Sequence, residues 1–216
     1  MCFDLDGTIL DSYGEGLNRL LEIARSRNLP TDETIVHAIK NSWHISAHGV
    51  ISSAWPEADH NMIQTEWSAK DARDPLPLLD RVQETLERLR KFFFLGILTN
   101  RSEVSTLRQL ERMPSVFDFV YSAKKEFYKP HPSSMEQVFQ KCQELEINHG
   151  HITYIGDVAE TDWQLARNVN VRFVGVLSGA GTRESFIKSG LQEKYILDSI
   201  ADLPNFYEID KLVPFR

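Results

Sequence analysis

Three carboxylates and one ammonium group occupy positions from which they could share a single site. Asp4 and Asp6 follow the first apolar residues of the chain, Lys129 begins a Lys-Pro pair, and Asp157 follows a glycine. If these side chains converge, the carboxylates repel one another unless a hard cation lies among them, and Mg²⁺ prefers such oxygen ligands. A phosphate dianion that approaches a carboxylate needs positive charge, which Lys129 and the metal would provide. The residue types therefore indicate phosphoryl chemistry, with Asp4, Asp6 and Asp157 as metal ligands.

Each of these groups follows an apolar segment that we expect to be a β-strand. The pattern predicts strands over 1–3, 92–98, 117–121, 152–155 and 171–177, with helices over 82–89, 104–110, 133–145 and 160–168. Strands with few polar positions, separated by helices, are typical of a parallel sheet that is covered on both faces. Because ligands gather at the carboxyl ends of such strands, Thr99 and Asn100 are expected at the same site, where the Thr99 hydroxyl could bind phosphate oxygens.

Residues 16–74 have a different pattern and are expected to form an inserted, all-helical domain. Leu17, Leu20, Leu21 and Ala24 have helical spacing, and the stretch holds three of the four tryptophans and four of the seven histidines. Pro75 and Pro77 then interrupt the chain as a hinge. The predicted organisation is a core domain over 1–15 and 75–216 and a helical domain over 16–74.

Composition excludes several other classes of protein. The 216 residues are 42% apolar and 25% charged, which is typical of a globular chain, and 24 basic against 31 acidic residues give a net charge of −7. This balance makes a nucleic-acid partner unexpected. No apolar run approaches the length of about 20 residues that crosses a bilayer, and no secretory leader is evident. Cys2 and Cys142 are far apart, which fits a reducing compartment, and we expect a cytoplasmic protein without a membrane partner.

Four motifs in this order resemble the haloacid dehalogenase superfamily, and most closely its phosphoglycolate phosphatase-like branch, in which a helical cap is inserted after the first motif. They are FDLDGTILDS at 3–12, LTNR at 98–101, KPHP at 129–132 and GDVAETD at 156–162. The resemblance implies a Rossmann-like, doubly wound core with a cap. It also implies a magnesium-dependent phosphatase that acts on a small-molecule phosphate ester. Dehalogenation is disfavoured because Asp6 supplies an acid that halide removal does not need.

The resemblance also implies a role for each motif residue. Asp4 would attack phosphorus, forming an aspartyl phosphate, and bind Mg²⁺ through its other oxygen. Asp6 would protonate the leaving alcohol, later deprotonate water, and reach the metal through its backbone carbonyl. Thr99 and Lys129 would hold the phosphoryl group. Asp157 would ligate Mg²⁺, with Asp162 orienting metal-bound waters or Lys129.

Substrate choice is expected to depend on the cap, on a segment around residues 41–48. Trp43 and His44 from this segment, with Asn100 and Arg101 after the second motif, are the candidate substrate contacts. Many relatives have glycine near the start of this segment. Its absence here disfavours phosphoglycolate itself and favours a larger or aromatic leaving group. His44 and His48 could share a helical face, but they have no evident third metal ligand.

Three other functions remain open from the sequence. A sugar-phosphate mutase would pass the phosphoryl group to a sugar hydroxyl, and an inactive relative would bind a partner through its cap. A receiver-type signalling module also uses acids, Thr and Lys around Mg²⁺, but the motif order and the size of the helical insertion argue against it. We expect a monomer or a homodimer.

Overall fold

The described part of the chain forms a six-stranded sheet in which every neighbouring pair is parallel, in the order β3-β2-β1-β4-β5-β6. The computed structural model describes residues 1–43, 47–111, 113 and 116–215. The strands are β1 (Cys2–Phe3), β2 (Gly96–Thr99), β3 (Phe119–Ser122), β4 (Thr153–Gly156), β5 (Arg172–Val176) and β6 (Ile196–Leu197). The predicted α/β class and parallel sheet are confirmed.

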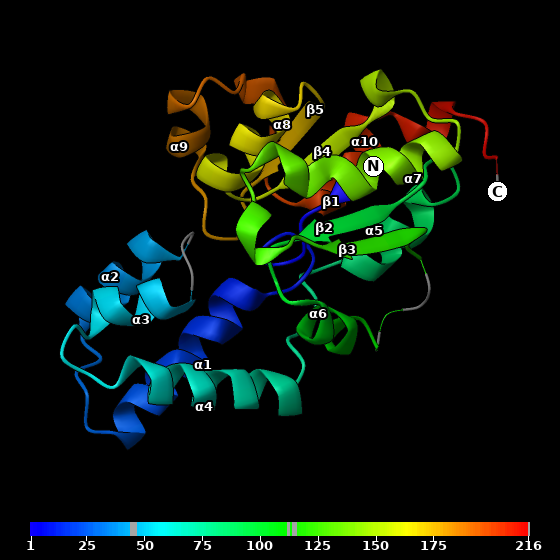
Figure 1. Ribbon diagram of the computed structural model, residues 1–216. Helices are drawn as coiled ribbons and strands as arrows, with labels where there is room; N and C mark the ends of the chain where they lie inside the picture. Colours follow the sequence, from blue (N-terminus) through cyan, green and yellow to red (C-terminus); the bar gives the residue numbers. More distant parts are fainter. Residues whose placement is uncertain (44–46, 112, 114–115, 216) are drawn as a thin grey trace.

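Helices cover both faces of this sheet (Figure 1). Successive strand residues point to opposite sides, so Ile97 and Ile155 belong to one apolar cluster while their neighbours Leu98 and Tyr154 belong to another. The first cluster includes residues of α5 (Val82–Leu89) and α10 (Leu203–Phe206), and α6 (Glu103–Leu110) packs at its margin. The second includes residues of α7 (Glu136–Glu144), α8 (Gln164–Asn168) and α9 (Arg183–Lys188). The core is therefore doubly wound, as predicted.

Four consecutive helices form a lobe beside this core (Figure 1): α1 (Ser12–Ser26), α2 (Glu33–Ser42), α3 (Ala47–Ala54) and α4 (His60–Arg73). Asp11, Asp32 and Asp59 precede three of them, and each side chain accepts a hydrogen bond from a first-turn backbone N–H. The lobe has its own apolar cluster, which includes Leu20, Ile39, Ile51 and Ile63. We call residues 12–73 the helical lobe.

Several elements differ from the sequence-based expectation, among them two strands and the helices α9 and α10, which were not predicted. The strand predicted over 92–98 begins only at Gly96, because the backbone N–H groups of Phe92 and Phe93 donate to Leu89 O and wrap the end of α5. Strand β6 was not predicted, since its two residues carry no periodicity of their own. It exists because β5 offers a free edge for pairing.

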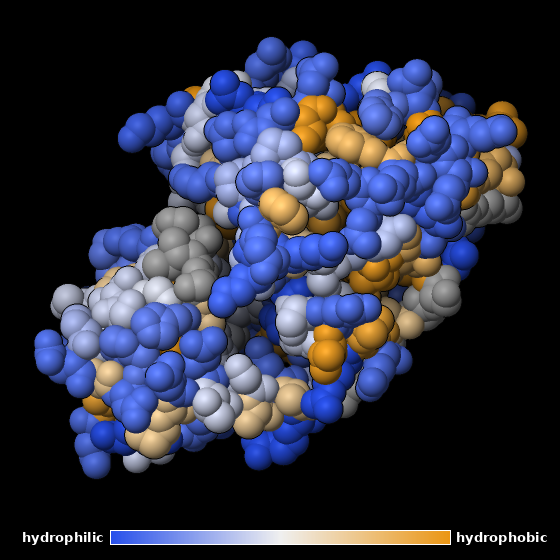
Figure 2. All heavy atoms as spheres, in the orientation of Figure 1, coloured by the Kyte–Doolittle hydropathy of each residue, from blue (hydrophilic) through white to orange (hydrophobic). Residues whose placement is uncertain are grey.

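Figure 2 shows a face on which hydrophilic and apolar side chains are mixed over both the core and the helical lobe. Among the described residues, none of the helices has the length and apolar character needed to cross a membrane.

Candidate active site

The predicted motif residues meet where the strand order reverses. Strand β1 pairs with β2 on one side and with β4 on the other, and in doubly wound sheets this switch point is where ligands bind. Asp4 follows β1 and donates its backbone N–H to Ile155 O at 2.8 Å, while Asp157 follows β4. The sheet therefore places these two acids next to each other.

Lys129 connects the acids of the site. Its Nζ lies 2.7 Å from Asp4 Oδ1, 2.7 Å from Asp162 Oδ1 and 2.8 Å from the Tyr154 hydroxyl, and all four side chains are buried. Burial acts to lower the pKa of Lys129, but the charges of Asp162 and Asp4 outweigh it and raise that pKa. The ammonium is therefore charged and fixed in place.

Asn100 holds the backbone that carries this lysine. Its Oδ1 accepts from Lys129 N at 2.8 Å and its Nδ2 donates to Lys129 O at 3.2 Å. Thr99 is 1% exposed, and its Oγ1 accepts from Arg101 N at 3.1 Å. The second and third motifs are thus joined, although 29 residues separate them. Contact of Asn100 or Thr99 with substrate remains a prediction.

Asp4, Asp157 and Asp162 form a buried carboxylate cluster whose ligand oxygens lie within 4.8 Å of one another. Burial raises the pKa of Asp4 to about 7, against the opposing charge of Lys129. Burial and the charges of Asp162 and Asp4 also raise the pKa of Asp157. No salt bridge between described residues reaches Asp157, whose Oδ2 accepts only from Ala180 N, at 2.8 Å. This excess of negative charge on hard oxygen donors fits a divalent cation.

Asp162 lies behind the other two acids. Its Oδ1 is bonded to Lys129 and lies 3.3 Å from the Tyr154 hydroxyl, while its Oδ2 accepts from Val158 N at 3.1 Å. With both oxygens engaged, Asp162 is placed to orient Lys129, and Asp4 and Asp157 are the acids better placed to hold a metal.

The loop after β5 completes the site, and the sequence reasoning missed it. A Cβ on Gly179 would lie 2.0 Å from Asp157 Oδ2 and 2.8 Å from Gly7 Cα. Ser178 Oγ donates to Gly7 O at 2.8 Å. The run Ser178-Gly179-Ala180-Gly181 directly after an apolar strand was the available signal, since small residues permit close backbone approach. Tyr154 was also missed, because inside a strand it resembles an ordinary core residue.

Asp6 is not one of the three acids of the carboxylate cluster. Arg101 Nε and Nη2 donate to its two oxygens at 3.0 and 2.5 Å, which is a bidentate ion pair. Burial acts to raise the pKa of Asp6, but the Arg101 charge and hydrogen bonds outweigh it and lower that pKa. Arg101 was predicted to contact substrate; in this structure its guanidinium contacts Asp6. Neither the predicted acid–base role of Asp6 nor its backbone metal contact is tested by this geometry.

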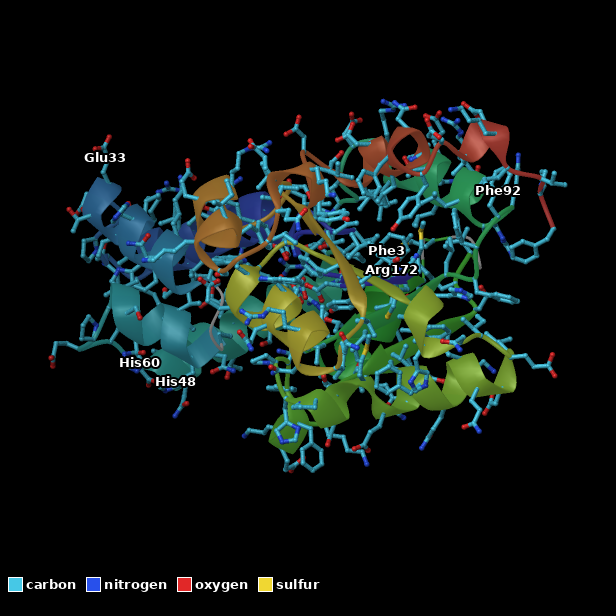
Figure 3. The ribbon with its side chains drawn as sticks, turned by 90° about the horizontal axis from the view of Figure 1, so that it is seen from above. Phe3, Glu33, His48, His60, Phe92 and Arg172 are labelled. Carbon is cyan, nitrogen blue, oxygen red and sulfur yellow. The ribbon has the colours of Figure 1, made fainter. Side chains whose placement is uncertain are left out.

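In the helical lobe, Trp43 packs edge-on against Tyr13 at 5.4 Å and beside Trp67 at 5.7 Å, measured between ring centroids. His44 lies outside the described residues, so neither its predicted substrate contact nor its pairing with His48 can be placed. His48 instead lies against His60, with ring centroids 5.2 Å apart (Figure 3).

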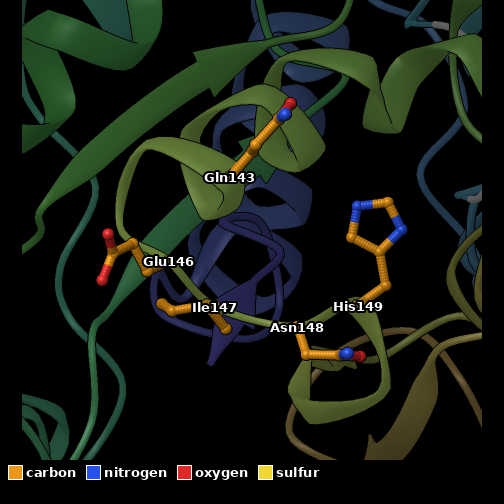
Figure 4. Close-up of a pocket in the computed structure, with 5 residues that line it drawn as sticks. All are labelled: Gln143, Glu146, Ile147, Asn148 and His149. Atoms are coloured by element: carbon orange, nitrogen blue, oxygen red, sulfur yellow. The ribbon is translucent and has the colours of Figure 1, made fainter.

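A surface hollow elsewhere takes no part in the site. It is lined by Gln143, Glu146, Ile147, Asn148 and His149 (Figure 4). These residues precede β4, so they lie at the amino end of that strand, whereas Asp157 follows its carboxyl end. None of the predicted residues lines the hollow.

Comparison with known proteins supports the motif assignment. The haloacid dehalogenase-like hydrolase family matches residues 1–176. N-acylneuraminate-9-phosphatase of Mus musculus is 25% identical over 230 residues, covering 94% of this chain and 90% of the mouse protein. A predicted phosphoglycolate phosphatase from Haemophilus somnus has a TM-score of 0.76 at 19% identity, with coverage of 95% and 96%. The HAD-type protein YfnB of Bacillus subtilis, bound to magnesium, has a TM-score of 0.75 at 17% identity, with coverage of 96% and 97%. With four motifs gathered at one switch point and a family match over most of its length, the chain belongs to the haloacid dehalogenase-like hydrolase family.

Proposed function

We propose that this protein is a magnesium-dependent phosphatase that hydrolyses a small phosphorylated metabolite through an aspartyl phosphate on Asp4. The observation that carries the proposal is the contact of Lys129 with Asp4 beside Asp157 at the switch point of the sheet. The matching family and the phosphatase names of the relatives support it. Asp4 and Asp157 are the residues that would hold Mg²⁺, which supplies positive charge for binding the phosphoryl group.

In the first step, a carboxylate oxygen of Asp4 attacks phosphorus and the bond from phosphorus to the ester oxygen breaks. Lys129 stabilises the phosphoryl oxygens, since its charge is already fixed beside Asp4. The Thr99 hydroxyl would bind another phosphoryl oxygen.

Asp6 serves both steps as the proton carrier. In the first step, Asp6 as an acid gives a proton to the departing alkoxide. In the second step, Asp6 as a base takes a proton from the water that attacks the aspartyl phosphate. Inorganic phosphate then leaves and the Asp4 carboxylate is restored. The ion pair with Arg101 opposes protonation of Asp6 in this structure. The acid step therefore requires that this pairing loosen when substrate binds.

We further propose that the helical lobe is a cap that contacts the leaving group. The proposed cap domain covers residues 16–74, so that residues 12–15, the first turn of α1, belong with the core domain of 1–15 and 75–216. Its separate apolar cluster supports an independent packing unit. A cap that closes over the phosphate would exclude water from the aspartyl phosphate until the leaving group departs. Trp43 remains the candidate contact for a large or aromatic leaving group.

The test is release of inorganic phosphate from 4-nitrophenyl phosphate and from a panel of phosphorylated metabolites, each with Mg²⁺ and with excess chelator. We expect release that requires Mg²⁺ and is lost in Asp4→Asn. Conversion of a sugar phosphate to its isomer without phosphate release would instead show a mutase. Absence of turnover on every ester, in a folded protein that binds Mg²⁺, would show a non-catalytic relative.

A further inference from the structure

Arg101 is shared between the core and the helical lobe. Two of its nitrogens are used by Asp6, and the third, Nη1, lies 3.6 Å from Asp71 Oδ2 and donates to Ser105 Oγ at 2.9 Å. The side chains of Arg101 and Asp71 are 14% and 17% exposed, so the pair is largely shielded from solvent. A single planar guanidinium therefore faces one acid from the first motif and one acid from α4.

Asp71 is itself held firmly. Its Oδ1 accepts from Arg19 Nη1 at 3.0 Å, and the same nitrogen of Arg19 donates to Asp74 O at 2.6 Å. Arg19 belongs to α1 and is buried. The carboxylate of Asp71 thus has a fixed place at the end of α4, and Arg101 must adjust to it.

This end of α4 is also joined to α6, the helix that follows the second motif. Gln109 Nε2 donates to Asp71 O at 3.3 Å, and Gln109 Oε1 accepts from Leu76 N at 2.7 Å. Arg108 Nη1 donates to Ala72 O at 3.4 Å. A movement of the lobe relative to the core would therefore act first on the residues around Arg101.

We propose that Asp71 is a positioning residue that acts through Arg101 to set where the carboxylate of Asp6 lies. A bidentate guanidinium fixes the plane of the carboxylate that it binds. Because the third nitrogen faces Asp71, the position of the lobe sets the position of the guanidinium and so of Asp6. Asp71 touches no reacting atom. The inference rests on the proposed acid–base role of Asp6.

The experiment compares kcat/KM for phenyl phosphate and 4-nitrophenyl phosphate in Asp71→Asn. Phenolate needs a proton from Asp6 as it leaves, whereas 4-nitrophenolate leaves almost without one, so only the first reaction depends strongly on where Asp6 lies. We expect a loss of about three- to tenfold for phenyl phosphate, the range for disturbing a partly buried ion pair, and of less than about twofold for 4-nitrophenyl phosphate.

Glu66→Gln is the matched control. Glu66 lies on the same helix and pairs with Arg27 of α1 at 2.6 Å, and no ion pair between described residues joins it to Arg101, so kcat/KM for both substrates should be unaffected. In a protein that already carries Arg101→Gln, adding Asp71→Asn should not change further the ratio of kcat/KM for phenyl phosphate to kcat/KM for 4-nitrophenyl phosphate. If Asp71→Asn does not fold, Asp71→Glu displaces the carboxylate and is expected to change the same ratio.

If Asp71→Asn loses kcat/KM equally on both substrates, or leaves it unchanged on both as Glu66→Gln does, the positioning role of Asp71 is overturned. Failure of the unmodified protein to hydrolyse either ester would instead refute the proposed function, so the two failures are distinguishable.

Discussion

Lys129 Nζ lies 2.7 Å from Asp4 Oδ1, although 125 residues separate them in the sequence. The same ammonium contacts Asp162, so one buried cation compensates two buried carboxylates. Such a group stabilises the fold only while its partners are present, because an unpaired buried charge is costly.

Replacement of Lys129 by Met should therefore destabilise the metal-free protein. Two buried carboxylates lose their cation, and we expect the free energy of unfolding to fall by about 3–5 kcal/mol, with loss of phosphatase activity. Urea denaturation in chelator measures this. Lys141→Met is the control, since Lys141 is only half-buried and its partner Glu144 is exposed to solvent, and it should leave the denaturation midpoint almost unchanged. Equal midpoints for the two variants would contradict the stabilising role of Lys129.

Asp6→Asn should separate the two chemical steps. Asparagine can neither give nor take the proton, but 4-nitrophenolate leaves without an acid, so Asp4 should still be phosphorylated. We expect a burst of about one equivalent of 4-nitrophenol followed by turnover at least about a hundredfold slower than in the unmodified protein. Mass spectrometry of the acid-quenched protein should then show one added phosphoryl group. Steady turnover without a burst, at the unmodified rate, would remove Asp6 from its role.

The stability of the metal-free protein should fall as the pH rises. Burial raises the pKa of Asp4 from 3.8 to about 7 in the folded state. Between pH 3.8 and about pH 7, Asp4 keeps its proton in the folded protein and has lost it in the unfolded chain. The contribution of Asp4 to the free energy of unfolding is therefore largest below pH 3.8 and declines towards pH 7. Asp157 acts in the same direction. Thermal melting across this range in chelator should show the decline, and Asp4→Asn should show a shallower one.

Added Mg²⁺ should reverse this loss, because it requires the ionised carboxylates. At a hundredfold excess over its dissociation constant it would stabilise the fold by about 2.7 kcal/mol. The increase in Tm should be larger at pH 8 than at pH 5, and it should vanish in Asp157→Asn. A Tm increase that is independent of both pH and Asp157 would place the metal elsewhere.

Gly179→Ala should weaken metal binding without a change in charge. The added methyl group would lie 2.0 Å from Asp157 Oδ2, so the carboxylate must move, and displaced ligands typically cost about ten- to a hundredfold in metal affinity. Calorimetric titration with Mg²⁺ measures this. Gly150→Ala is the control, because its nearest neighbour would lie 3.4 Å away. Unchanged affinity in Gly179→Ala would show that the loop after β5 does not shape the site.

Local sequence was sufficient to predict the elements that carry the site. Apolar runs that end in Asp4, Thr99 or Asp157 predict buried strands with functional ends, since such patterns depend on neighbours along the chain. The strand ends were less accurate: Phe92 and Phe93 are as apolar as strand residues but pack around the end of α5. The neighbouring sequence does not distinguish an apolar side chain in a strand from one that packs at the end of a helix.

The amino-acid sequence by itself determined the parallel α/β core, the helical insertion and the motif residues of the site, because strand and helix periodicity and short motifs are local properties. Only the tertiary structure decided which groups touch. It placed Tyr154 against Lys129, Gly179 against Asp157 and Arg101 between Asp6 and Asp71. These contacts join residues distant along the chain, and their energies depend on burial and distance, which no single segment specifies.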